Sequence, residues 1–174
     1  MKTVPITLTL SALAVASTAW MPNPSGQTHK LGTGSSFHAS VNGAVSTEIS
    51  GDARFGAVSG TAGAPATFTV SLGAYGEHGS ILFTSWAPKR LEAGLYRVSD
   101  LMDEAAVQAL VVTGSTEHPT GSFRVHAGTL TIIKSSDNRI DGIYDLQAEG
   151  FTADAPEQEG RTIHVTGSFT ALAQ

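Results

Sequence analysis

The side chains in this chain best suited to chemistry are three of its six histidines. His38, His126 and His164 each stand within an alternating run whose apolar members are expected to face a core, which places all three on the outer face. If the first and last strands lie side by side, His38 comes near His164, and three imidazoles on one sheet face could bind zinc or copper. No two of them have the spacing of local ligands, so we expect ordinary surface histidines and no metal or other cofactor.

Two sets of carboxylates could supply acid–base chemistry, and they comprise Asp100, Asp103 and Glu104, and Asp141, Asp145 and Glu149. The second set alternates with apolar residues along one strand and is therefore expected on its outer face. Paired catalytic carboxylates need a cleft that perturbs their pKa, whereas a charged, solvated face protects a sheet from aggregation. We therefore expect a solvated strand face at Asp141, Asp145 and Glu149.

Motifs for known reactions are missing from the sequence. It contains no nucleophile elbow, phosphate-binding loop, dinucleotide fingerprint or paired-histidine zinc motif. Nothing marks one serine as the nucleophile of a Ser-His-Asp triad. The larger aromatic candidates for a binding surface are Tyr75, Trp86, Tyr96 and Tyr144, but aromatic residues make up 7% of the chain, and core packing is the expected role of Trp86 and Tyr144. We expect no catalytic residue and no enzyme activity.

The elements that would position these side chains are strands. Between Gly128 and Ala171, three strand-like runs are joined by turn residues, which predicts an antiparallel meander. Earlier in the chain, alternating runs recur every eight to twelve residues, and Asn42-Gly43 predicts a two-residue type I′ turn. Residues 99–106 carry a helix cap, acidic residues and two alanines, which favour one or two helical turns. The fold class expected is all-β, an antiparallel β-sandwich or flattened barrel of about ten strands with one short helical segment.

The N-terminus has the features of an export signal. Met1-Lys2 is followed by an apolar run from Val4 to Val15 and by the small-residue pattern Ala14-Val15-Ala16. We expect residues 1–19 to be a signal peptide or an N-terminal anchor, residues 20–34 a linker, and residues 35–174 a single β domain. The predicted location is the periplasm or the extracellular space, with membrane contact only through a retained N-terminal segment.

Composition narrows the possible partners. Charged residues are 14% of the chain and the formal net charge is −5, with no run of Lys or Arg. A basic stripe is the footprint of a nucleic-acid binder, so no nucleic-acid partner is expected. The chain has no Cys, which excludes disulfides and thiolate metal sites.

The closing motifs resemble those of a known class of domains. Gly128-Thr-Leu-Thr-Ile, Gly142-Ile-Tyr-Asp-Leu-Gln-Ala and Val165-Thr-Gly-Ser-Phe-Thr-Ala are similar to successive GTLTI, GxFxFxA and VTxGxF strands of uncharacterised secreted bacterial domains. Asn42-Gly43 and the run Gly51 to Phe55 fit an early element of the same domains. The resemblance covers about two-thirds of the chain. It implies a secreted β-sandwich or barrel-like domain and transfers no catalytic residue.

Together these features favour an exported, non-enzymatic binding or structural module, such as an accessory subunit of a larger cell-envelope assembly with a protein partner. The alternative is a carrier of a small apolar ligand, which requires a barrel-like body around a pocket. A hydrolase is the third possibility and requires a concave site where histidine and carboxylate groups converge.

Overall fold

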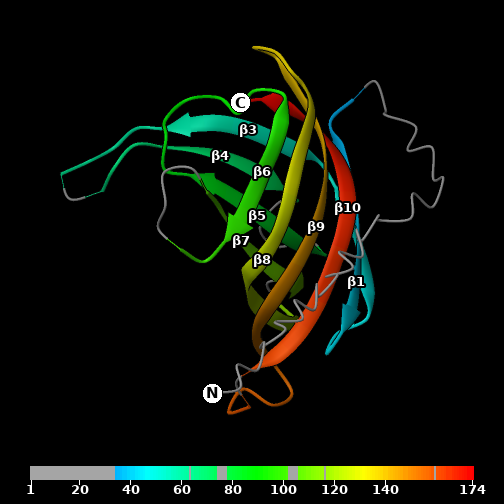
Figure 1. The fold of residues 1–174 in the computed structure, drawn as a ribbon. Helices are drawn as coiled ribbons and strands as arrows, with labels where there is room; N and C mark the ends of the chain where they lie inside the picture. Colours follow the sequence, from blue (N-terminus) through cyan, green and yellow to red (C-terminus); the bar gives the residue numbers. More distant parts are fainter. Residues whose placement is uncertain (1–33, 63, 74–77, 102–105, 116, 159) are drawn as a thin grey trace, which may run out of the picture.

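The computed structural model describes residues 34–62, 64–73, 78–101, 106–115, 117–158 and 160–174 (Figure 1). These residues form ten strands, and none of them is helical. The strands are β1 (Ser36–Gly43), β2 (Thr47–Gly51), β3 (Ala53–Val58), β4 (Thr67–Leu72), β5 (Gly79–Ser85), β6 (Gly94–Ser99), β7 (Val107–Gly114), β8 (Pro119–Ser135), β9 (Arg139–Thr152) and β10 (Arg161–Ala173). In the described part of the chain, no helix is long and apolar enough to cross a membrane.

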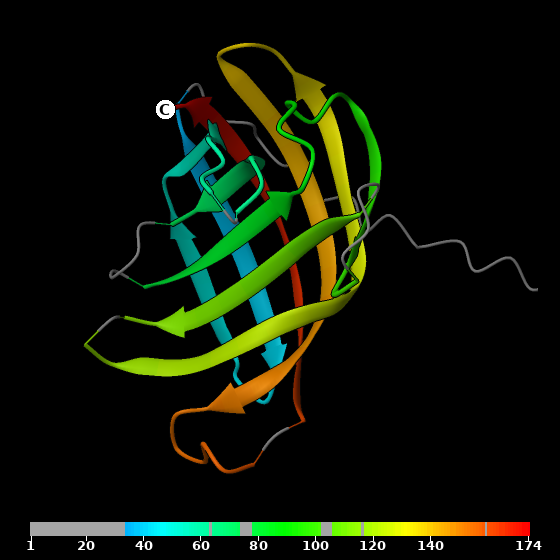
Figure 2. The same ribbon diagram turned by 90° about the vertical axis from the view of Figure 1, so that its left-hand side faces the viewer.

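The strands form one mostly antiparallel sheet that closes into an uneven, barrel-like ring. Strands β6, β8, β9, β10, β1 and β2 lie side by side in that order, and β3, β4, β5 and β7 form the opposite layer (Figures 1 and 2). Parallel pairing between the ends of β10 and β3 closes the ring. The all-β prediction is therefore confirmed.

The long strand β8 belongs to both layers. Its first part, Gly121–Arg124, pairs with β7, and its second part, Ala127–Ile132, pairs with β6. A bulge between Val125 and Ala127 separates the two parts. Bulges bend a strand and increase its twist, so one strand can turn the corner between two layers.

Alternation of apolar and polar residues builds the core between the layers. In β4, for example, Phe68, Val70 and Leu72 are buried while the Thr and Ser residues between them point outward. The middle of the core is filled by the rings of Phe83, Tyr144 and Phe169, whose centroids lie 5.5–6.4 Å apart. These rings add edge and face contacts to the burial of their apolar surface, which makes them the centre of the core.

Two glycine–aromatic pairs hold β9 and β10 together. Phe169 of β10 lies opposite Gly142 of β9, and Tyr144 of β9 lies opposite Gly167 of β10. A Cβ added to Gly142 would stand 2.7 Å from the Phe169 ring, and one added to Gly167 would meet the Tyr144 ring. Each aromatic ring thus lies over a glycine of the neighbouring strand, which is the physical reason for the Gly-x-aromatic spacing in the closing motifs.

The described residues differ from two local predictions, the turn at Asn42-Gly43 and the helical segment at residues 99–106. Asn42 and Gly43 do not form a two-residue turn, because both continue β1 and pair with His164 and Ile163 of β10. The hairpin to β2 exists, but its turn lies after Gly43, at residues 44–46. In the predicted helical segment 99–106, Ser99 ends β6, and residues 100, 101 and 106 are not helical. The middle of the segment, residues 102–105, lies outside the described residues.

Candidate functional site

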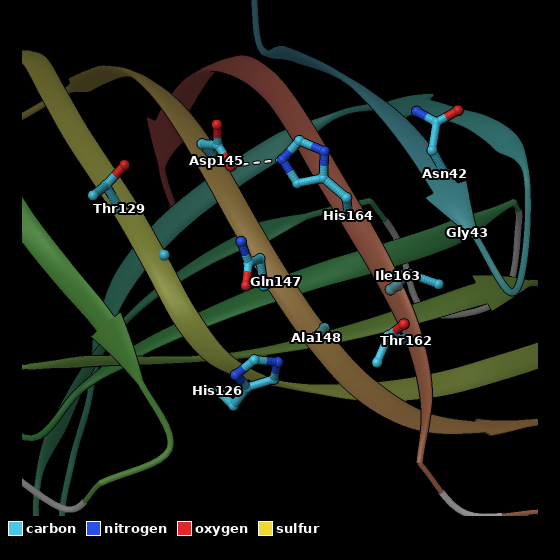
Figure 3. Close-up of a pocket in the computed structure, with 11 residues that line it drawn as sticks. Asn42, Gly43, His126, Thr129, Asp145, Gln147, Ala148, Thr162, Ile163 and His164 are labelled. Atoms are coloured by element: carbon cyan, nitrogen blue, oxygen red, sulfur yellow. Dashed lines mark hydrogen bonds and ion pairs between the residues drawn. The ribbon is translucent and has the colours of Figure 1, made fainter. Parts of the chain in front are cut away.

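Several polar residues gather in a hollow on the outer face of β1, β10, β9 and β8 (Figure 3). It encloses about 830 Å³. Most of its lining side chains are polar and come from outward positions of the four strands; the lining residues are Asn42, Gly43, His126, Gly128, Thr129, Asp145, Gln147, Ala148, Thr162, Ile163 and His164. Period-2 alternation places them there, because their neighbours fill the core.

The hollow contains a histidine–carboxylate pair. His164 Nε2 lies 2.7 Å from Asp145 Oδ1, with Gln147 beside them on β9 (Figure 3). About half of the His164 side chain and 63% of the Asp145 side chain are exposed. Such a pair could orient an imidazole as a base, but among the described residues no Ser lines the hollow, and the hydroxyl groups there belong to Thr129 and Thr162. Solvent also weakens the interaction between the two exposed groups.

Two of the three outward histidines, His126 and His164, line this hollow, whereas His38 stands apart from them. His38 pairs with Ser168, and His164 pairs with Asn42, so His38 and His164 stand four residues apart along the strands, or about 13 Å. His38 instead lies 3.1 Å from Glu48 of β2. Among the described residues, no group of three or more His, Cys, Asp or Glu side chains could hold a metal ion. The expectation of outward positions is confirmed, whereas the proximity of His38 to His164 is wrong.

Asp141 corrects the prediction of a solvated carboxylate face. Asp145 and Glu149 are exposed as expected, but Asp141 is 3% exposed. Its carboxylate accepts two hydrogen bonds from Arg139 Nε, at 2.8 and 3.0 Å, and one from the Thr170 hydroxyl, at 2.9 Å. Alternation placed Asp141 on the outer face, but neighbouring side chains from β9 and β10 enclose it there. A buried carboxylate with these partners fits a structural role.

The remaining candidates are scattered. Tyr144 is buried in the core, where loss of solvent raises the pKa of its hydroxyl well above the ordinary value. Tyr96 is half-buried and donates to the Glu92 carbonyl oxygen, with burial the main cause of its raised pKa. Trp86 is also half-buried, and Asp100 is exposed. Tyr75, Asp103 and Glu104 lie outside the described residues.

A further group, which we call the aliphatic cluster, consists of Leu95, Ile133 and Ile143. Leu95 of β6 and Ile143 of β9 both pair with Thr131 of β8, which lies between them. Ile133 stands two residues after Thr131, in the second bulge of β8. The exposed fractions of the cluster are 71%, 52% and 40% in chain order. Sequence reasoning missed it, although the adjacent apolar residues at 132–133 and 143–144 break the alternation and were the available signal.

No protein-family model, curated protein or solved structure matches this chain.

Proposed function

We propose that this chain is an exported module that acts by binding a protein partner in the cell envelope, as an accessory or structural subunit of a larger assembly. Export is inferred from the charged, apolar and small-residue order of the first 19 residues. The observation that carries the binding role is the aliphatic cluster. Leu95, Ile133 and Ile143 are large and exposed and lie on three neighbouring strands, and Leu95 has the largest exposed fraction among the exposed large hydrophobic residues of the described part of the chain.

A catalytic function at the polar hollow has less support than protein binding at the aliphatic cluster. Its imidazole and carboxylate are both well exposed, and a catalytic acid–base pair is usually held where water is restricted. The alternative of an apolar-ligand carrier requires a pocket inside the barrel-like body, whereas both described hollows lie on its outside and are open to solvent. The rings of Phe83, Tyr144 and Phe169 also occupy the middle of the core.

Affinity purification of the full chain from envelope fractions tests this proposal. The expected result is one stable partner, recovered in comparable amounts from repeated preparations, with recovery reduced by Leu95→Asp and Ile143→Asp. Leu82→Asp is the matched control, because Leu82 is an outward residue of β5 in the opposite layer and is 36% exposed. Repeated recovery of the monomer alone, at low salt and with mild crosslinking, would contradict a binding role.

A further inference from the structure

In the layer that carries the aliphatic cluster, β2 and β6 each have one edge that no described strand pairs with along its length. At one end of the layer, β1 is the only strand among the described residues that pairs with β2. At the other end, β6 forms a six-residue ladder with β8, while its second edge has a single bridge to β7, between Val98 and Val107. Among the described residues, Gly94 to Arg97 pair with β8 only, so their backbone groups that point away from β8 have no strand partner in that part of the chain. An open edge is a template for another extended chain.

The two edges differ in how they are protected. The β2 edge carries the exposed carboxylate of Glu48, and just past its end the carbonyl of Asp52 accepts a hydrogen bond from the Gly73 amide at 2.8 Å. Charge and hydrogen bonding of this kind discourage pairing with a foreign strand. The β6 edge has no proline, and its first three residues, Gly94 to Tyr96, carry no charge. Its exposed apolar side chain is Leu95.

Positive charge flanks the aliphatic cluster. Arg97 lies two residues after Leu95 on the same strand, and Lys134 follows Ile133; both are exposed. Within the described residues neither cation makes an ion pair. The nearby carboxylates of Glu92 and Asp137 are both engaged by Arg90. On a chain of net charge −5, two unpaired cations around an apolar cluster favour a ligand that is itself acidic.

From these observations we infer that the open edge of β6 binds an extended segment of the partner protein as an added strand. The segment's backbone pairs with Gly94–Arg97, its outward apolar side chains contact the aliphatic cluster, and its acidic side chains face Arg97 and Lys134. Strand addition of this type draws affinity from main-chain hydrogen bonds and specificity from alternate side chains. This inference rests on the proposed binding function and names the segment and edge that carry it out.

The test places a photoreactive benzophenone amino acid at position 95 of the full chain in the producing cells, with position 82 as the control site. The expected product is a crosslink from position 95 to one contiguous stretch of the partner that contains alternating apolar residues and at least one Asp or Glu. A synthetic peptide of that stretch should then bind the full chain and slow amide hydrogen exchange at Gly94–Arg97 by about tenfold or more. Arg97→Glu should weaken peptide binding by a similar factor, whereas Arg54→Glu on β3 should not.

The outcomes separate the two proposals. If the partner is recovered but the crosslinks reach a second copy of this chain, residues 1–33 of the chain itself, lipid, or a discontinuous folded surface, strand addition at β6 is wrong while the binding function stands. Unchanged exchange at Gly94–Arg97 in the peptide complex also overturns it. If neither purification nor crosslinking yields any partner, the binding function itself is wrong.

Discussion

The buried hydroxyl of Tyr144 should make the fold sensitive to alkaline pH. The side chain lies between Phe83 and Phe169, and its hydroxyl donates to the His38 carbonyl oxygen at 3.3 Å. Burial raises its pKa well above the ordinary value, so the folded protein keeps the proton under conditions where the unfolded chain loses it. The stabilising effect is complete below the unfolded-state pKa, about 10, and declines as the pH rises above it.

The size of this effect follows from the linkage between protonation and folding. Each pH unit above about 10 should remove about 1.4 kcal/mol from the free energy of unfolding, or about 2 kcal/mol by pH 11.5. Tyr144→Phe removes the ionisable group and should abolish this part of the decline. At pH 7 the same variant should lose about 0.5–1.5 kcal/mol, because one buried hydrogen bond is missing. The stability curves of the two proteins should therefore cross between about pH 10 and about pH 11.

Urea unfolding between pH 7 and pH 11.5 measures both curves, and absorbance at 295 nm follows tyrosine ionisation directly. Tyr96→Phe is the control, since Tyr96 is only half-buried and its loss should change the slope less. Parallel stability curves for the wild type and Tyr144→Phe up to pH 11.5 would refute the reasoning, because they would mean that the Tyr144 hydroxyl ionises equally in both states.

Three further predictions concern packing, the buried ion pair and metal binding. Gly142→Ala should lower the free energy of unfolding by about 1–3 kcal/mol, because the new methyl group would lie 2.7 Å from the Phe169 ring. The control is Gly56→Ala, whose methyl group meets only the Gln174 side chain at 3.6 Å and should change the free energy of unfolding little. Arg139→Ala should lower the free energy of unfolding by about 3 kcal/mol, because it leaves the Asp141 carboxylate buried without its cation. Replacing Arg139 by Met and Asp141 by Leu together should restore most of that loss. Equal losses for the single and the double variant in urea unfolding would argue against a buried pair. Zinc added in excess should leave the midpoint of thermal unfolding unchanged, because His38 lies far from His164 and the described residues contain no group of three potential ligands. A rise of several degrees would reveal a metal site.

The sequence predicted the class of fold and the inward residues because alternation is a local property. Every strand that alternates has only one face that can be buried, so Phe68 and Val70 or Ile163 and Val165 could be assigned without knowing their neighbours. The turn at Asn42-Gly43 was predicted from local propensity and is displaced, since both residues gain ladder partners in β10. Pairing with a distant strand can outweigh the preference of a dipeptide for a turn.

The candidate site was harder to predict because solvation on an outward face depends on side chains from other strands. Asp141 and Asp145 share one face of β9, yet Asp141 is enclosed by Arg139 and Thr170 while Asp145 is exposed. Thr170 lies 29 residues away in the chain, and no local pattern announces that contact. In the same way, the exposure of Leu95 follows from the place of β6 at the end of its layer, which is known only when the strand order is known.

The glycine–aromatic pairs also bear on how function can be sought in chains with this pattern. Gly142 and Tyr144, together with Gly167 and Phe169, are residues of the closing motifs, and all four serve the contact between β9 and β10. A chain can therefore share these motifs because the same interior must be packed, whatever its outer face binds. The informative positions are then outward residues that the fold does not require. Leu95 is such a position, because it is 71% exposed and contributes little to the core.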